Sequence, residues 1–272
     1  MNRVELTLIT NKSQFARRAE RAGIDRIMID LERLGKAKRQ CARQLFLSDH
    51  YPTDIDRLRS TLSTAAIQVR VNSWNPQSLL EINDVISRGA QVVMLPMVRD
   101  REQAAQFVGA VNGRARTSLL IETAAALDGC DELLSLDGID EAHIGLNDLA
   151  IDLGREFIFD ALADRLLDRI ACLAAQRHIR FGFGAVAGRA CGSLPIDPEI
   201  IIGEQTRLGA SVVWLGRSYS RASEKLCQLE LRTEISWIRS RFEQPGDNEV
   251  NFRALQKQLS FWKTVDALAV AS

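Results

Sequence analysis

Charged side chains stand at the carboxyl ends of several short apolar runs in this 272-residue sequence. Glu122 ends one run, Asp148 follows the next, and Arg70 interrupts an earlier run near its end. If the runs are neighbouring parallel strands, their carboxyl ends meet at one edge of a sheet. A charge buried there without a partner is strongly destabilising. Each of these residues therefore requires an ion-pair partner or a ligand.

Glu122 and Asp148 have the chemistry of a divalent-metal site. Two carboxylates on adjacent strand ends, together with water and substrate oxygens, provide the all-oxygen ligands that Mg²⁺ or Mn²⁺ prefers. Arg70 would then hold a substrate carboxylate through two parallel hydrogen bonds, which a lysine does less well. The alternative is an internal ion-pair network of these three residues that braces the fold. Spacing alone leaves both interpretations open.

Eight β-rich runs position these residues, and amphipathic segments separate them. The runs cover residues 5–10, 26–31, 67–72, 91–97, 117–123, 140–146, 180–186 and 211–216. Most are nearly continuous apolar stretches, which are typical of parallel strands buried on both faces. The alternation predicts a (β/α)₈ TIM barrel. A doubly wound open sheet is the rival fold, but residues 10–13 (TNKS) lack the glycine-rich turn that usually follows its first strand.

Capping signals mark the intervening helices. Asn75 and Pro76 predict a helix start, with Asn75 as the N-cap and Pro76 as the first helical residue. Asp100 predicts the start of another helix, which Asn112 ends.

The chain contains no linker rich in Pro, Gly or Ser, so we expect one catalytic TIM-barrel domain over residues 1–245. Residues 246–272 are expected to form a C-terminal helical extension, because apolar residues recur there at helical spacing: Phe252, Leu255, Leu259 and Trp262. Exposed apolar positions on this helix would indicate a contact with another subunit in a homo-oligomer.

Composition excludes several classes of function. Lys+Arg and Asp+Glu both count 35, so no basic field attracts nucleic acid or an anionic membrane. The apolar runs are far shorter than the roughly 20 residues of a membrane helix, and Glu5 stands where a signal peptide would continue into its apolar core. The 5 cysteines form no CxxC pair, which disfavours a zinc site. We expect reduced thiols in a cytoplasmic protein.

Five segments, in this order, resemble the HpcH/HpaI aldolase and citrate lyase beta-subunit family. They are MIDLE (28–32), VRVN (69–72), LPMV (95–98), LIET (120–123) and IGLNDL (144–149). The resemblance extends from about residue 25 to residue 219. Each motif alone is weak, whereas the ordered set is specific.

This resemblance implies a TIM barrel that binds Mg²⁺, Mn²⁺ or a similar divalent ion and makes or breaks carbon–carbon bonds next to an enolate. The family's metal-binding Glu and Asp correspond to Glu122 and Asp148, and its carboxylate-binding Arg corresponds to Arg70. The metal would chelate the 2-oxo and carboxylate oxygens of a 2-oxo acid and stabilise the developing enolate. The second substrate would be an aldehyde or a sugar-derived compound. Family members commonly form trimers or hexamers.

The sequence departs from the family where a proton must be moved. In the hydroxy-oxo-acid aldolases a His directly follows the DxE element, and here that residue is Arg33; an assisting Asp corresponds to Ser87. A guanidinium with a pKa above about 12 is a poor base. The proton carrier is therefore expected to be water on the metal, Glu32, Lys36 or His143, in that order.

The candidate residues fall into three sets. The catalytic set is Arg70, Glu32, Arg33 and Lys36; the substrate-binding set is Arg70, Asn72, Trp74, His143 and Asn147; the metal ligands are Glu122 and Asp148. Some have plainer interpretations, since Trp74 could simply pack a loop and His143 could be a hydrogen-bonded residue of the barrel interior. Cations after the second run (Arg33, Lys36, Lys38 and Arg39) could hold an anionic substrate or simply form a solvated helix start.

The sequence thus predicts a metal-dependent aldolase, lyase or carbon–carbon bond-forming synthase that acts through the enolate of pyruvate or a related 2-oxo acid. Segments 30–40, 143–148 and 181–184 resemble a family branch associated with carbohydrate biosynthesis. One alternative is an acyl-CoA lyase of the citrate lyase beta-subunit type, which usually has another acid where Arg33 stands. The other is a barrel that has lost catalysis and serves as a binding or regulatory subunit, motivated by Arg33 and Ser87.

Overall fold

Eight parallel strands form the centre of the molecule in the computed structural model, which describes residues 3–36, 48–192, 194–244 and 246–270. Each strand begins within a predicted run or one residue before it. The strands are β1 (Glu5–Ile9), β2 (Arg26–Asp30), β3 (Ala66–Arg70), β4 (Val92–Leu95), β5 (Arg116–Ile121), β6 (Glu141–Ile144), β7 (Arg180–Phe183) and β8 (Val212–Trp214). They are consecutive neighbours, and β8 also pairs with β1. The predicted TIM barrel is confirmed, and the open-sheet rival is excluded.

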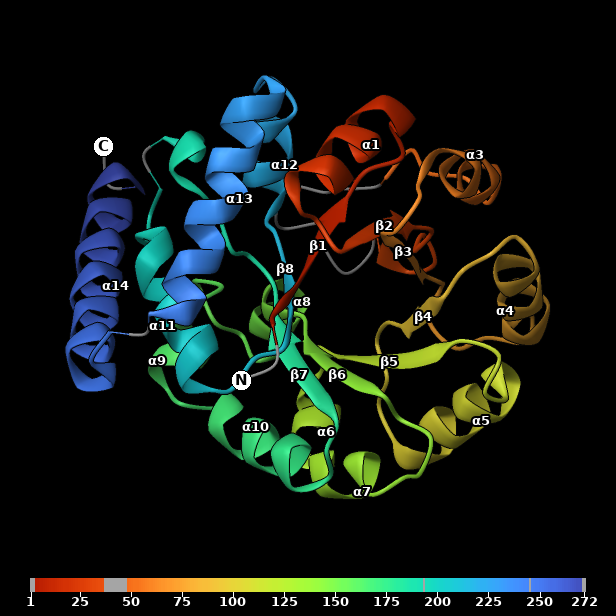
Figure 1. Cartoon of the computed structure of the whole chain (residues 1–272). Helices are drawn as coiled ribbons and strands as arrows, with labels where there is room; N and C mark the ends of the chain where they lie inside the picture. The colour runs from red at the N-terminus through yellow and green to blue at the C-terminus, as the bar shows by residue number, and fades with distance from the viewer. Residues whose placement is uncertain (1–2, 37–47, 193, 245, 271–272) are drawn as a thin grey trace.

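The barrel closes between β7 and β8 through a close approach of the two backbones. The Ser211 amide donates a 2.7 Å hydrogen bond to the Phe181 carbonyl, and Val186 and Leu215 form a parallel bridge. A Cβ at Gly182 would lie 1.6 Å from the Val212 carbonyl oxygen, so only glycine fits there. This glycine allows the circle of strands in Figure 1 to close.

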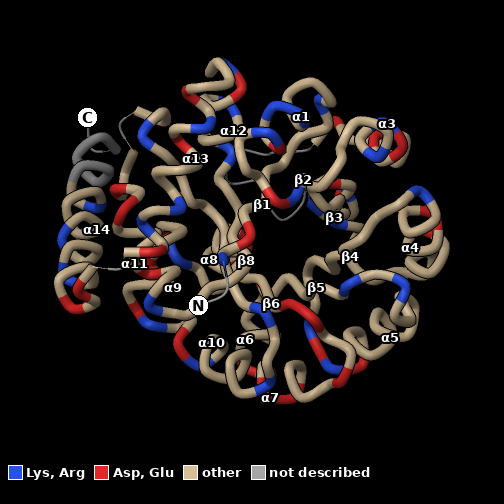
Figure 2. The backbone as a smooth tube through the Cα atoms, in the orientation of Figure 1, with Lys and Arg blue, Asp and Glu red and all other residues tan. Residues whose placement is uncertain are grey.

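Helices surround the strands (Figure 1) and carry most of the charged residues, with both signs mixed (Figure 2). Their apolar faces pack on the outside of the barrel. They are α1 (Ser13–Ala22), α3 (Thr53–Thr61), α4 (Ser78–Ser87), α5 (Arg101–Val111), α6 (Ala124–Asp128), α7 (Cys130–Leu134), α8 (Leu146–Asp152), α9 (Asp160–Ala163), α10 (Leu167–Gln176), α11 (Pro198–Arg207), α12 (Arg217–Ser223), α13 (Gln228–Glu243) and α14 (Asn248–Val270). Among the helices of the described ranges, none combines the length and apolar composition of a membrane span.

One predicted helix start is correct and one is wrong. Asp100 caps α5 by accepting a hydrogen bond from the Gln103 amide, and Asn112 ends that helix in the left-handed conformation. The helix predicted to begin at Pro76 begins at Ser78 instead. The reason is a turn at Asn75, whose side chain accepts from the Gln77 amide.

An ion-pair network fills the barrel interior at the amino ends of the strands. Arg26 is 1% exposed and donates two hydrogen bonds, of 2.7 and 2.9 Å, to the equally buried Glu141. Glu5 and Gln68 also accept from the Arg26 guanidinium. Because these side chains fill the barrel interior at the amino ends of the strands, space for a cavity remains at the carboxyl ends.

The C-terminal helix α14 packs against α11 of the same chain (Figure 1). Phe252, Leu255 and Leu259, three of the four apolar residues that predicted this helix, are buried within the chain. The helical segment is therefore confirmed, but these three residues do not form an exposed face. Val250 and Phe261 are the large apolar side chains of α14 that remain exposed in the described residues.

Candidate active site

A cavity of about 470 Å³ opens at the carboxyl ends of the strands. Its lining comes from the residues that follow β5, β6, β7 and β8, together with segments before α9 and α11. The carboxyl ends of the strands are where TIM-barrel enzymes carry their active sites. The predicted residues Lys36, Arg70, Glu122, Asn147 and Asp148 all line this cavity.

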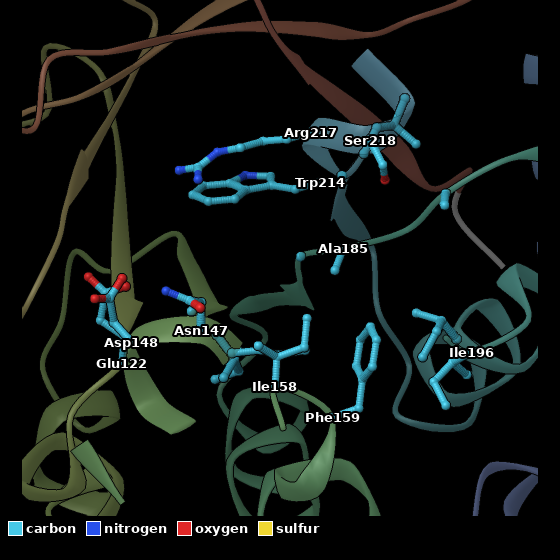
Figure 3. Close-up of a pocket in the computed structure, with 18 of the residues that line it drawn as sticks. Glu122, Asn147, Asp148, Ile158, Phe159, Ala185, Ile196, Trp214, Arg217 and Ser218 are labelled. Atoms are coloured by element: carbon cyan, nitrogen blue, oxygen red, sulfur yellow. The ribbon is translucent and has the colours of Figure 1, made fainter. Parts of the chain in front are cut away.

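Glu122 directly follows β5, and Asp148 lies in the first turn of α8, the helix that begins after β6. Figure 3 shows both side chains at the same end of the cavity. One carboxylate oxygen of Glu122 accepts a 3.0 Å hydrogen bond from the Met97 amide, and Met97 has a positive φ of 55°. A Cβ at Gly145 would lie 2.3 Å from the other oxygen. Met97, in a strained backbone conformation, therefore donates a hydrogen bond to the Glu122 carboxylate, and the absence of a side chain at Gly145 leaves space for that carboxylate.

Three carboxylates gather around this position. Burial raises the pKa of Glu122 well above its ordinary value, and the negative charges of Glu32 and Asp148 raise it further. Arg70 acts in the opposite direction without cancelling these effects. The excess of negative charge around Glu122 means that a cation between the carboxylates would stabilise their ionised forms.

The donor set fits a hard divalent cation. Glu122 and Asp148 supply carboxylate oxygens from neighbouring strand ends, and Mg²⁺ typically binds one or two carboxylates together with water and substrate oxygens. In the ranges that the structure describes, no three His, Cys, Asp or Glu side chains are arranged to enclose a metal by themselves.

A cluster of buried ion pairs lies beside the two carboxylates and fixes Arg70. Arg70 donates from Nε and Nη2 to the two Asp30 oxygens, at 2.8 and 2.7 Å. Lys36 Nζ lies 3.2 Å from both Asp30 and Glu32, and Arg70 Nη1 lies 3.4 Å from Glu32. A buried ion-pair network therefore surrounds Arg70, and Asp30 and Glu32 are among its acids.

Asp30 is the centre of this cluster. Burial alone would raise the pKa of Asp30, but the charges of Arg70 and Lys36 and a hydrogen bond from Ser48 hold it well below its ordinary value. The backbone amide of Asp30 donates to Nδ1 of His50 at 3.0 Å. The two hydrogen bonds with Asp30 thus hold Arg70 in one orientation at the cavity.

Arg33 and Asn72 are held outside the cavity lining. Arg33 Nη2 donates to the His50 carbonyl at 2.9 Å, and its guanidinium lies 4.9 Å from the centre of the Tyr51 ring. Asn72 Oδ1 accepts from the backbone amides of Arg33 and Leu34. These contacts fix residues 33 and 34 after β2, and neither the Arg33 nor the Asn72 side chain is among the described residues that line the cavity.

Other predicted residues also lie elsewhere. Trp74 is half-buried and packs against the hydrophobic core, outside the cavity lining. Ser87 is exposed at the end of α4, where its hydroxyl donates to the Asp84 carbonyl. Lys38 and Arg39 fall outside the described residues, so their proposed contact with an anion has no structural counterpart here.

His143 lies in the barrel interior behind Trp214. The two rings stack with centroids 4.2 Å apart, and Trp214, but not His143, lines the cavity. Burial lowers the pKa of His143 well below its ordinary value, and the charges of Arg26 and Arg70 add to the effect. His143 is therefore neutral and supports the ring that forms the cavity wall.

Arg217 and Trp214 are cavity residues that sequence reasoning did not select. Arg217 is the first residue of α12, which two residues separate from the end of β8, and its side chain extends alongside Trp214 towards the end of the cavity that holds Asp148 (Figure 3). Burial lowers the pKa of Arg217, and the positive charge of Arg70 contributes. The sequence feature that could have identified Arg217 is its position just after the eighth run, because active-site residues of this fold lie at the carboxyl ends of the strands.

The fold, the cavity and its paired carboxylates define a TIM barrel built for chemistry at the carboxyl ends of its strands. The HpcH/HpaI aldolase/citrate lyase family model matches residues 3–160. The chain belongs to this family, and with it to the carbon–carbon lyases.

Relatives in the family are named as aldolases. The chain is 28% identical over 177 residues to the hydroxypyruvate/pyruvate aldolase of Rhizorhabdus wittichii, a match that covers 53% of this chain and 68% of that protein. It is 29% identical over 224 residues to the enzyme of the same name from Agrobacterium fabrum, covering 68% and 77%. The 2-keto-3-deoxy-L-rhamnonate aldolase of Escherichia coli K12 is 30% identical over 149 residues, covering 44% and 52%.

Solved structures share the fold at lower identity. An HpcH/HpaI aldolase from Desulfitobacterium hafniense DCB-2 superposes with a TM-score of 0.60 at 16% identity, covering 90% of this chain and 95% of that one. The citrate synthase SbnG superposes with a TM-score of 0.61 at 16% identity, covering 89% and 95%.

Proposed function

We propose that this protein catalyses reversible aldol cleavage through the enolate of pyruvate or a related 2-oxo acid, with Mg²⁺ or Mn²⁺ held by Glu122 and Asp148. The observation that carries the proposal is the meeting of these two carboxylates with the cations Arg70, Arg217 and Lys36 in one cavity. The aldolase names of the relatives support the same reaction class.

The metal, when bound, supplies a Lewis acid that polarises the 2-oxo group. The chain supplies the rest of the substrate site. Arg70, fixed by Asp30, and Arg217 present two guanidinium groups to the cavity, and the carboxylate of the 2-oxo acid binds between them. Asn147 adds an amide at the same end of the cavity. These groups hold the acid so that its methyl or methylene carbon faces the remaining cavity.

Proton transfer requires a group other than Arg33, since this side chain is engaged outside the cavity. Lys36 lines the cavity, and its Nζ lies 3.2 Å from Glu32. Lys36 Nζ takes up the proton of the substrate hydroxyl during cleavage as it passes one of its own protons to the Glu32 carboxylate, and the reverse transfer delivers a proton to the enolate carbon. His143, behind Trp214, is not needed for this transfer.

Exchange of the pyruvate methyl protons tests the proposal, because enolisation in D₂O replaces them with deuterium without any second substrate. We expect exchange with Mn²⁺ or Mg²⁺, its loss with a chelator, and its loss in Glu122→Ala and Asp148→Ala. The matched control is Glu132→Ala, which removes an exposed carboxylate on α7. Undiminished exchange in either cavity variant, measured by proton NMR, would refute the assignment.

A homo-oligomer, as a trimer or hexamer, is the assembly that we propose. The exposed apolar side chains Val250 and Phe261 on α14 support a contact there. Light scattering coupled to size-exclusion chromatography tests this, and a monomer at micromolar concentration would refute it.

A further inference from the structure

The cavity has a second end whose chemistry differs from that of the carboxylate end. Ile158, Phe159, Ala185 and Ile196 line it, and we call these four residues the apolar wall. Figure 3 shows Phe159 and Ile196 on the opposite side of the cavity from Glu122 and Asp148, with Ile158 and Ala185 nearer the middle of the cavity.

The apolar wall comes from parts of the chain that are far apart in sequence. Ile158 and Phe159 directly precede α9, Ala185 follows β7, and Ile196 lies just before α11. Phe159 and Ile196 are 7% and 3% exposed, so both are firmly packed. The wall is therefore a built surface of the folded chain.

Polar groups are concentrated at the other end. The charged side chains that line the cavity in the described residues are Lys36, Arg70, Glu122, Asp148 and Arg217. Lys36 and Arg70 contact Glu32, and Arg70 and Arg217 interact electrostatically with Glu122 and Asp148, respectively, so these charges are grouped around the carboxylates. Among the described lining residues, Ser218 contributes the one hydroxyl, and its side chain is exposed to solvent. A hydroxylated ligand placed against the apolar wall would lose its hydrogen bonds to water without replacing them.

The 2-oxo acid does not fill this cavity. Pyruvate has six non-hydrogen atoms, which occupy on the order of 180 Å³ even at the roughly 30 Å³ that one water takes up in the liquid. The cavity measures about 470 Å³. Space for a second group thus remains beside the apolar wall.

We infer that the second substrate is an aldehyde carrying an uncharged hydrocarbon group, alkyl or aryl, rather than a sugar-derived aldehyde. This inference rests on the proposed function. In cleavage, a 4-hydroxy-2-oxo acid R–CHOH–CH₂–CO–COO⁻ loses its hydroxyl proton to the Lys36–Glu32 pair and its C3–C4 bond breaks. The products are R–CHO and the enolate of pyruvate, which takes the proton back at C3. The R group lies against the apolar wall throughout.

Two matched series of aldehydes test the inference with pyruvate as the first substrate. Straight-chain aldehydes from acetaldehyde to hexanal should show kcat/KM rising about fourfold for each added methylene until the wall is covered. Glycolaldehyde, glyceraldehyde and erythrose should react about 5- to 150-fold more slowly than the unhydroxylated aldehydes of the same carbon number, because their hydroxyls find no partner. Equal or faster reaction of the hydroxylated series would overturn the inference.

A substitution in the apolar wall separates the chain-length dependence of kcat/KM from differences in the intrinsic reactivity of the aldehydes. Ile158→Asn places an amide on the wall and should abolish the dependence on chain length while pyruvate exchange continues. Leu229→Asn makes a comparable change at a 72% exposed position on α13 and should leave the dependence intact. A chain-length dependence that survives Ile158→Asn would contradict the assignment of the wall.

Binding of an unreactive alcohol tests the apolar wall without requiring the proposed reaction to occur. Hexan-1-ol, followed by NMR titration, should bind the wild type more tightly than Ile158→Asn, and glycerol should show no such difference. If pyruvate exchange fails while hexan-1-ol binds as expected, the proposed reaction is wrong but the apolar site stands. If exchange succeeds and hexan-1-ol does not bind, the inference about the second substrate is wrong.

Discussion

Replacing Glu122 by glutamine should stabilise the metal-free protein at neutral pH while removing its ability to bind a divalent ion. Glu122 is 1% exposed, and burial together with the charges of Glu32 and Asp148 raises its pKa. A glutamine keeps the oxygen that accepts the Met97 amide and carries no charge. The variant therefore removes the repulsion and preserves the hydrogen bond.

The pH dependence has a definite sign. Because the pKa of Glu122 is raised in the folded state, the folded protein binds a proton there that the unfolded chain has already released above about pH 4.3. Wild-type stability therefore decreases as pH rises between that value and the raised pKa, by about 1.4 kcal/mol per pH unit. Glu122→Gln lacks this contribution, so its advantage over the wild type grows with pH across the same window.

Urea unfolding in the presence of a chelator, at pH 5, 6, 7 and 8, measures this difference. Adding Mn²⁺ should then reverse the order of stability, since a ligand at 100 times its Kd stabilises the folded state by about 2.7 kcal/mol. We expect this stabilisation in the wild type and not in Glu122→Gln. A stability difference that stays constant with pH, or equal stabilisation of both proteins by Mn²⁺, would refute the reasoning.

Three further substitutions probe the surroundings. Arg70→Lys loses the paired hydrogen bonds with Asp30 that fix the cation at the cavity and should lower the rate of pyruvate exchange by about 100-fold, an effect of roughly 2–3 kcal/mol; an unchanged rate would contradict a role in substrate binding. Gly145→Ala directs a Cβ at the Glu122 carboxylate and should weaken Mn²⁺ binding at least tenfold by calorimetry, with native-like circular dichroism; unaltered affinity would count against this geometry. Arg26→Ala leaves Glu141 buried without its main partner and should cost about 3–5 kcal/mol in urea unfolding, while exchange by the folded fraction continues; a loss below 1 kcal/mol would show that other residues replace it.

The fold could be predicted because apolar runs and their intervals are local properties of the sequence. All eight strands begin at or within one residue of a predicted run. The helix predicted at Pro76 was displaced to Ser78 because the Asn75 side chain forms a turn with the following backbone. Such a turn depends on one side-chain orientation, which hydrophobic spacing does not specify.

The site could be predicted where a strand end fixes the position of a residue. Arg70, Glu122 and Asp148 stand at or near strand ends, and all three line the cavity. Arg33 and Asn72 lie in or beside the loop after β2, where their direction is set by hydrogen bonds with residues far away in sequence. Sequence spacing could not reveal those contacts.

The apolar wall was missed for a related reason. Its residues come from three separate segments, and their apolar residue types are the same as those found in any hydrophobic core. Ile158 and Ile196 lie before α9 and α11 and line the cavity together with residues that follow the strands, and such an arrangement has no local sequence signature.

A crystal structure with Mn²⁺ and oxalate, an unreactive analogue of the pyruvate enolate, tests the central claim most directly. We expect one anomalous-scattering peak in the cavity, contacted by the carboxylates of Glu122 and Asp148 and by oxalate, with the Arg70 and Arg217 guanidinium groups at the oxalate oxygens. Manganese bound elsewhere, or Glu122 and Asp148 turned onto Arg70 with no ion between them, would contradict it.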